Sequence, residues 1–130
     1  MRSLWLRIRV PVVIALLLTT TTLSDAQSNR TRRVRFARGR TTTVIKDSVV
    51  RGTVDRYILR ASAGQTLTVH ITSIEDNAVF GVHRTGSRRA LSDAEETKDW
   101  SGELPRTGDY VIEVGTMRGN AGYTLEVTIR

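Results

Sequence analysis

From residue 41 onward, apolar and polar residues alternate with a period of two, the pattern of a strand with one buried face. The alternation is clearest at residues 67–71, 78–82, 110–114 and 123–129. The last of these segments is the longest and predicts the longest strand. Three less regular segments predict further strands, at residues 42–46, 49–59 and 100–104. The chain therefore alternates like a β-protein over most of its length.

Turn-forming residues separate these segments. Gly, Pro, Asn and Asp cluster at 63–64, 75–77, 85–86, 105–109 and 119–122. One helical turn is predicted at residues 90–98, with Ser92 as its cap and Glu95 three residues later. Many short strands at this spacing, without a long helix, predict an all-β fold: a single antiparallel β-sandwich or small barrel at residues 41–130. In that fold Trp100 packs in the core or at a sheet edge, with a sugar-stacking role as the alternative.

The first 26 residues have the pattern of a signal peptide. Three arginines precede the apolar run 10–18, and Ser24-Asp25-Ala26 offers a cleavage site before Gln27. The uncharged run 10–24 contains Pro11 and is shorter than the roughly 20 apolar residues of a spanning helix. We therefore expect a periplasmic or secreted mature protein with no transmembrane segment.

The formal charge of +7 is unevenly distributed along the chain. Residues 41–130 carry 11 basic and 12 acidic side chains, which argues against a specific nucleic-acid partner for the domain. Residues 27–40 carry six arginines and no acid: Arg30, Arg32, Arg33, Arg35, Arg38 and Arg40. Such a self-repelling segment predicts a disordered basic arm. The arm either binds an anionic cell-envelope polymer or is merely a solvated leader.

Candidate chemistry is sparse. The chain has no cysteine, which excludes a disulfide, a thiolate zinc site and a cysteine nucleophile. Its two histidines lack metal-binding spacing, and the acidic segment 93–99 does not match a calcium loop. No serine lies in a Gly-x-Ser-x-Gly motif. We expect no metal, no cofactor and no enzymatic activity.

Several stretches together resemble one family. These are 57–69, which contains AGQTLTV, then 100–105, the TGDY of 107–110, and 123–129, which begins with YTLEV. They are similar to the small exported bacterial proteins that inhibit goose-type lysozyme in the periplasm, and to bacterial pre-peptidase C-terminal domains. The resemblance covers most of residues 49–130. It implies a jelly-roll-like sandwich, a turn at 63–65 into a core strand, and a tight turn at 108–110 that delivers a buried tyrosine.

The same resemblance suggests a binding site at residues 114–118. The stretch Val-Gly-Thr-Met-Arg matches a Val-x-x-Met-Arg pattern that precedes functional arginines on the last hairpin of these inhibitors. It implies that Arg118 and Asn120, with Tyr57 as a weaker candidate, bind a lysozyme and occlude its cleft. The following loop 119–122 lacks the further arginines often found in the family, so a plain surface arginine is the alternative.

Two functions therefore stand at this point. The first is an exported inhibitor of a goose-type lysozyme that acts by cleft occlusion. The second is a non-catalytic module, similar to the pre-peptidase domain, that docks to cell-envelope polymers or to a partner protein.

Overall fold

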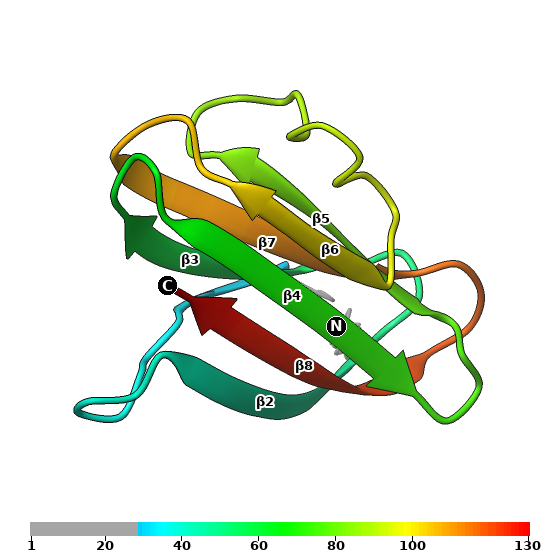
Figure 1. The fold of residues 1–130 in the computed structure, drawn as a ribbon. Helices are drawn as coiled ribbons and strands as arrows, with labels where there is room; N and C mark the ends of the chain where they lie inside the picture. Colours follow the sequence, from blue (N-terminus) through cyan, green and yellow to red (C-terminus); the bar gives the residue numbers. More distant parts are fainter. Residues whose placement is uncertain (1–28) are drawn as a thin grey trace, which may run out of the picture.

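Two four-stranded sheets face each other in the computed structural model, which describes residues 29–130 (Figure 1). One sheet has the strand order β1-β3-β7-β5 and the other β2-β8-β4-β6. The strands are β1 (Arg30–Arg33), β2 (Thr42–Val49), β3 (Asp55–Ala61), β4 (Thr66–Ser73), β5 (Ala78–Arg84), β6 (Asp99–Glu103), β7 (Gly108–Thr116) and β8 (Ala121–Ile129). Neighbouring strands run antiparallel, except that β1 is parallel to β3. The expected all-β sandwich is confirmed.

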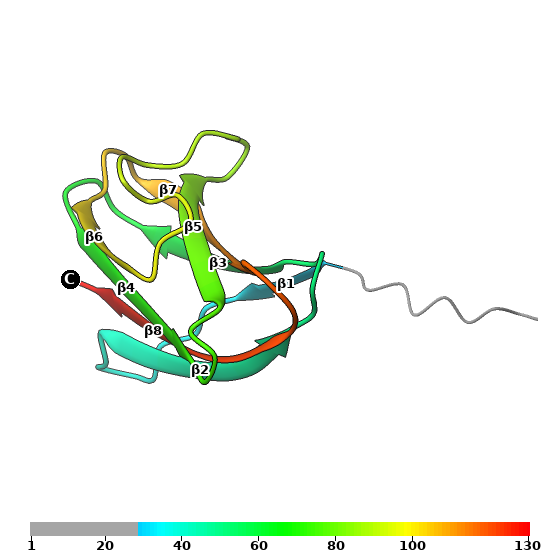
Figure 2. The ribbon, with the colours of Figure 1, turned by 90° about the vertical axis from the view of Figure 1, so that its right-hand side faces the viewer.

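The core lies between the sheets and is filled by the residues that alternate in sequence. In β4, Leu67, Val69 and Ile71 are buried while the residues between them face solvent. β8 shows the same alternation from Ala121 to Val127. Figure 2, which looks onto one end of the sandwich, shows the two layers. The period-two alternation thus reports directly which face of each strand is buried.

The expected turns also form. Gly64 adopts a positive φ of 85° between β3 and β4, a conformation that glycine adopts without steric cost. Tyr110 is buried, and its hydroxyl donates to the Arg106 carbonyl at 2.6 Å, four residues upstream. This contact is a tyrosine corner, a device of β-sandwiches that fixes the chain where it enters a strand.

The predicted helical turn at residues 90–98 is wrong. This segment instead runs along the free edge of β5, where Thr97 exchanges two backbone hydrogen bonds with Phe80. Nearby, Val82 donates to the Ala94 carbonyl and accepts from Leu91. The segment supplies partners that the edge strand would otherwise lack, and this need outweighs a weak local preference for helix. The predicted strand at 49–59 is likewise interrupted by a turn at 50–54, where Gly52 has a φ of 80°.

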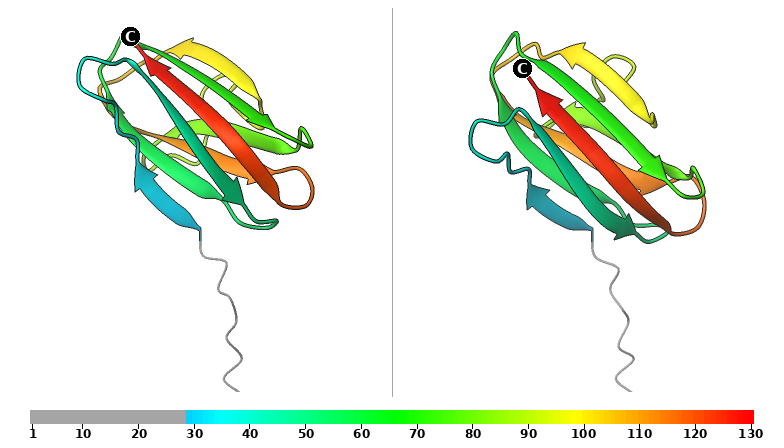
Figure 3. Two further views of the ribbon diagram at one scale, coloured as in Figure 1. Left: turned by 90° about the horizontal axis from the view of Figure 1, so that it is seen from below. Right: turned by 60° about the horizontal axis from the view of Figure 1, so that its bottom comes forward.

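The expectation of a disordered arm is wrong for Arg30–Arg33, which form β1 beside β3 (Figure 3). The pairing continues one residue further, because Val34 donates its N–H to the Ile58 carbonyl at 2.8 Å and is itself only 8% exposed. Repulsion among the arginines is offset by acidic side chains that the fold brings beside them. The predicted signal peptide, residues 1–26, and the first two arm residues lie outside the described part of the chain. Within residues 29–130, no helix is long and apolar enough to cross a membrane.

Candidate functional site

Three loops meet at one end of the sandwich, which we call the hairpin end: residues 50–54, 74–77 and 117–120 (right-hand side of Figure 1; facing the viewer in Figure 2). The Arg51 N–H donates to the Asn120 side-chain oxygen at 2.9 Å. The Arg118 guanidinium donates to the Glu75 carbonyl at 3.0 Å. Each of the other two loops is therefore tied directly to the β7–β8 hairpin, which carries two of the predicted binding residues.

The buried side chain of Asn77 holds the β7–β8 hairpin in place. This side chain is 1% exposed, and its Nδ2 donates to the backbone carbonyls of Arg118 and Asn120 at 2.9 and 3.0 Å. The backbone of Asn77 is fixed in turn, because the Ser73 hydroxyl accepts its N–H at 3.0 Å. Since the buried Asn77 amide binds both carbonyls, it holds the 117–120 loop in one conformation. The sequence indicated only a turn at Asn77, because its partners lie more than 40 residues away.

Exposed apolar side chains gather around this hairpin. The described residues include four large apolar side chains that are exposed to solvent: Val44, Val50, Ile74 and Met117. Three of them lie on the hairpin end, where Ile74 is fully exposed and Met117 is 63% exposed. Exposed apolar groups clustered beside an arginine are typical of protein-binding surfaces. Ile74 was missed in the sequence, although it follows β4 directly and shares the parity of its solvent-facing residues, so an apolar side chain there breaks the alternation.

Tyr57 does not belong to this surface. It is 2% exposed, its hydroxyl is hydrogen-bonded to that of Tyr123, and the Arg32 guanidinium lies 5.3 Å from its ring centroid. Its choice as a partner-binding residue was wrong, because odd-numbered residues of β3 point into the core alongside Leu59.

A polar network links β1 to both sheets and centres on Asp55, which is 3% exposed. Its carboxylate accepts two hydrogen bonds from Arg30, at 3.0 and 2.9 Å, and one from the Tyr123 hydroxyl at 2.7 Å. Arg30 also donates to Asp47 at 3.0 Å, across the gap between the sheets. Burial, the bond with Tyr57 and the contact with Asp55 raise the pKa of Tyr123 far above its usual range, so it remains a donor.

Asp47 forms ion pairs with two arginines, Arg30 and Arg32. The Arg32 guanidinium approaches it at 2.5 Å, while the Ser48 N–H donates to the same carboxylate at 2.7 Å. Burial by itself raises the pKa of Asp47, but the Ser48 N–H and the Arg32 and Arg30 guanidiniums outweigh it and lower that pKa to about 2. Arg33 pairs with Asp109 at 3.3 Å. The structure thus assigns three of the six arm arginines to internal ion pairs.

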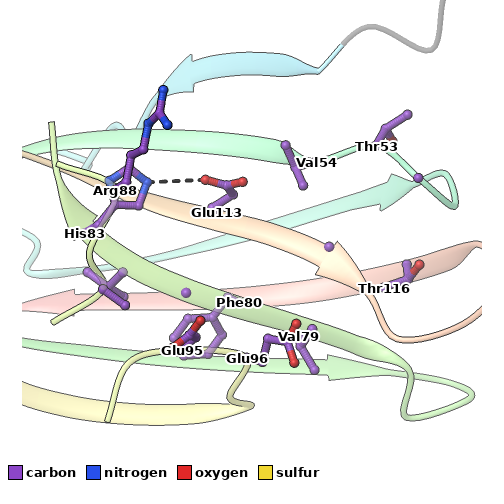
Figure 4. A pocket seen from close by; sticks show the side chains of 15 residues that line it. Thr53, Val54, Val79, Phe80, His83, Arg88, Glu95, Glu96, Glu113 and Thr116 are labelled. Atoms are coloured by element: carbon purple, nitrogen blue, oxygen red, sulfur yellow. Dashed lines mark hydrogen bonds and ion pairs between the residues drawn. The ribbon is translucent and has the colours of Figure 1, made fainter. Parts of the chain in front are cut away.

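A groove lies elsewhere, on the outer face of the β1-β3-β7-β5 sheet (Figure 4). It has a volume of about 460 Å³, and Gly81 and Gly115 contribute to its lining. The His83 ring nitrogen Nε2 lies 3.3 Å from the Glu113 carboxylate. The described residues that line the groove include no serine to complete a Ser-His-acid triad, and neither Arg118 nor Asn120 reaches it. Within residues 29–130, no three His, Asp or Glu side chains are placed to share a metal ion.

Comparison with known proteins identifies the family. No protein-family profile matches the sequence, and a sequence search of curated proteins gives no significant match. Among solved structures, Aeromonas hydrophila PliG, a periplasmic lysozyme inhibitor of g-type (goose-type) lysozyme, is 31% identical. Its match has a TM-score of 0.68 and covers 79% of this chain and 99% of that protein. This chain belongs to the PliG family.

More distant structures share the PliG fold. Salmonella Typhimurium PliG is 18% identical with a TM-score of 0.64, over 78% of this chain and 99% of that protein. The pre-peptidase C-terminal domain of a Bacillus anthracis collagenase is 14% identical with a TM-score of 0.55, over 78% of this chain and 96% of that domain. Both resemblances expected from the sequence are confirmed at the level of the fold.

Proposed function

We propose that this PliG-family protein is an exported or periplasmic inhibitor of a g-type lysozyme and that its hairpin end occludes the lysozyme cleft. The observation that carries the proposal is the clustering of Ile74, Met117 and Val50 around Arg118 on loops that hydrogen bonds fix in place. The 31% identical Aeromonas protein, an inhibitor of this class, supports it.

The chemistry of such a surface is binding without reaction. Arg118 makes a single side-chain hydrogen bond in the described structure, to the Glu75 carbonyl, so its remaining N–H groups are available to a carboxylate or carbonyl in the cleft. Met117 and Ile74 supply apolar area that becomes buried on contact. Asn120 shapes the site, since its side-chain oxygen is used to hold the loop at Arg51.

Inhibition assays test the proposal. Residues 27–130 would be titrated against a g-type lysozyme, with hen-type and invertebrate-type lysozymes as specificity controls. We expect loss of lytic activity toward the g-type enzyme near equimolar inhibitor. Unchanged lysis at a tenfold excess of inhibitor would refute the proposed function.

Single substitutions then test the surface. Arg118→Ala and Ile74→Ser should each raise the inhibition constant about tenfold or more, as expected for losing roughly 1.5 kcal/mol of a charged hydrogen bond or of apolar burial. Val44→Ser is the matched control, because Val44 is similarly apolar and exposed but lies on β2 away from the hairpin. Equal effects of Ile74→Ser and Val44→Ser would remove the hairpin end from the mechanism.

A further inference from the structure

The opposite end of the sandwich, which we call the arginine end, is dominated by guanidinium groups. There the loops 34–41, 62–65 and 104–107 meet the C-terminus (left-hand side of Figure 1). Backbone hydrogen bonds join them: Ile129 to Thr41, Arg130 to Thr66, and Leu104 to Gln65. Six exposed arginines lie on these segments or beside them: Arg35, Arg38, Arg40, Arg60, Arg106 and Arg130.

These six charges are not neutralised within the described structure, where none of them forms an ion pair. Two acids lie at this end, Glu103 and Asp109, and Asp109 is paired with Arg33. Most of the other carboxylates of residues 29–130 lie in the half of the sandwich nearer the hairpin end, and so do both lysines of these residues. Charge is therefore segregated by the fold, a property that the near-neutral total of residues 41–130 conceals.

The arm contributes to this surface because β1 anchors it. Pairing of β1 with β3 and the buried Val34 fix the start of the 34–41 loop, and β2 fixes its end. Phe36 packs against the core between them, and the Arg40 N–H closes a turn on the Ala37 carbonyl at 2.9 Å. Arg35, Arg38 and Arg40 are thus displayed from a loop held at both ends, which lowers the entropy cost of engaging a partner.

We propose that the arginine end docks the protein on an anionic phospholipid surface. Planar guanidinium groups bind phosphate through paired hydrogen bonds, and each basic residue near an anionic bilayer adds to the attraction. The four exposed large apolar residues of the described chain lie off the loops of this end, so docking is electrostatic and without insertion. Phe36 is half-buried and no Phe, Trp or Tyr side chain of residues 29–130 is exposed, so the usual stacking platform of a single-stranded nucleic-acid binder is missing.

Vesicle binding tests the proposal. Residues 27–130, which contain all eight described strands, would be sedimented with phosphatidylcholine vesicles containing or lacking 30% phosphatidylglycerol. The key variant is R38Q/R40Q/R106Q, and the matched control is K46Q/R51Q/R118Q, which removes the same charge from outside the arginine end. We expect binding only to the anionic vesicles, and loss of that binding in high salt.

The variants separate a local surface from bulk charge. At about fivefold per arginine, R38Q/R40Q/R106Q should bind roughly 100-fold more weakly, whereas the control triple should stay within about threefold of the parent. Equal loss in both triples, or no binding to anionic vesicles, would overturn the proposal. Tighter binding to single-stranded DNA than to vesicles at equal phosphate concentration would overturn the lipid assignment. If the key triple melts more than 5 °C below the parent, R38Q/R130Q takes its place, with an expected loss of about 25-fold and K46Q/R51Q as its charge-matched control. Because no lysozyme is present, failure here leaves the proposed inhibitor function untouched.

Discussion

At the scale of single residues, Asp55 shows why the N-terminal strand exists. A carboxylate that is almost fully buried is costly unless its charge is paired and its oxygens accept hydrogen bonds. Arg30 and Tyr123 meet both requirements, from positions 25 residues before it and 68 after it in the sequence. Tyr123 was predictable as an apolar-face residue by its alternation, whereas Tyr57 was taken for a binding residue. The hydroxyl partners of both were not predictable, because no local pattern reports a contact across the sandwich.

Asp47 makes this network dependent on pH. Its pKa in the folded protein is about 2, below the ordinary value of 3.8. The folded state therefore favours the charged form, and the stabilisation is present above pH 4 and lost as the pH falls through about 2. We expect Asp47→Asn to lower the free energy of unfolding by about 1 kcal/mol at pH 6. The expected loss is small because the Arg30 and Arg32 side chains are nearly half exposed to solvent. Urea unfolding between pH 2 and 6 measures this, and equal pH slopes for parent and variant would contradict it.

At the scale of elements, the four strands with clean alternation, β4, β5, β7 and β8, were predictable from sequence. β1 was not, because all four of its residues are exposed and it buries no apolar face. Its stability comes from hydrogen bonds with β3 and from ion pairs with acids distant in sequence. The edge segment 90–98 was missed for the same reason, since its pairing with β5 is tertiary. Alternation of apolar and polar residues predicts the strands that build the core, but it does not predict segments that only cover a sheet edge.

Two arginines of the former arm provide a matched test of β1. Arg30 donates to Asp55, Asp47 and the Ser48 carbonyl, whereas Arg35 is exposed and forms no ion pair in residues 29–130. We expect Arg30→Gln to lower the free energy of unfolding by about 2 kcal/mol, because it strips a buried carboxylate of its cation. For a domain of about 100 residues this is a fall in Tm of roughly 8–16 °C. Arg35→Gln should shift the Tm by less than 2 °C. Calorimetry compares them, and similar values would mean that β1 does not hold Asp55 in place.

At the scale of the whole molecule, the fold separates two surfaces by the length of its strands. β8 runs from the hairpin end to the arginine end, and its nine residues span about 30 Å. The total charge suggested a single basic property of the chain. The structure instead places three arginines in the ion pairs of β1, displays others at the arginine end, and leaves Arg51 and Arg118 at the hairpin end.

This separation predicts how salt affects inhibition. Electrostatic influence decays over about 8 Å at 0.15 M salt but about 30 Å at 0.01 M. Against a cationic g-type lysozyme, R38Q/R40Q/R106Q should therefore keep the parent's inhibition constant at 0.15 M, because the removed charges are far from the contact. At 0.01 M its association rate should rise severalfold, because repulsion from the distant arginines is then felt. Rapid-mixing measurements of association at the two salt concentrations test this, with Arg118→Gln as the variant that weakens inhibition at both. Weaker inhibition by the triple variant at 0.15 M would show that the arginine end itself touches the lysozyme.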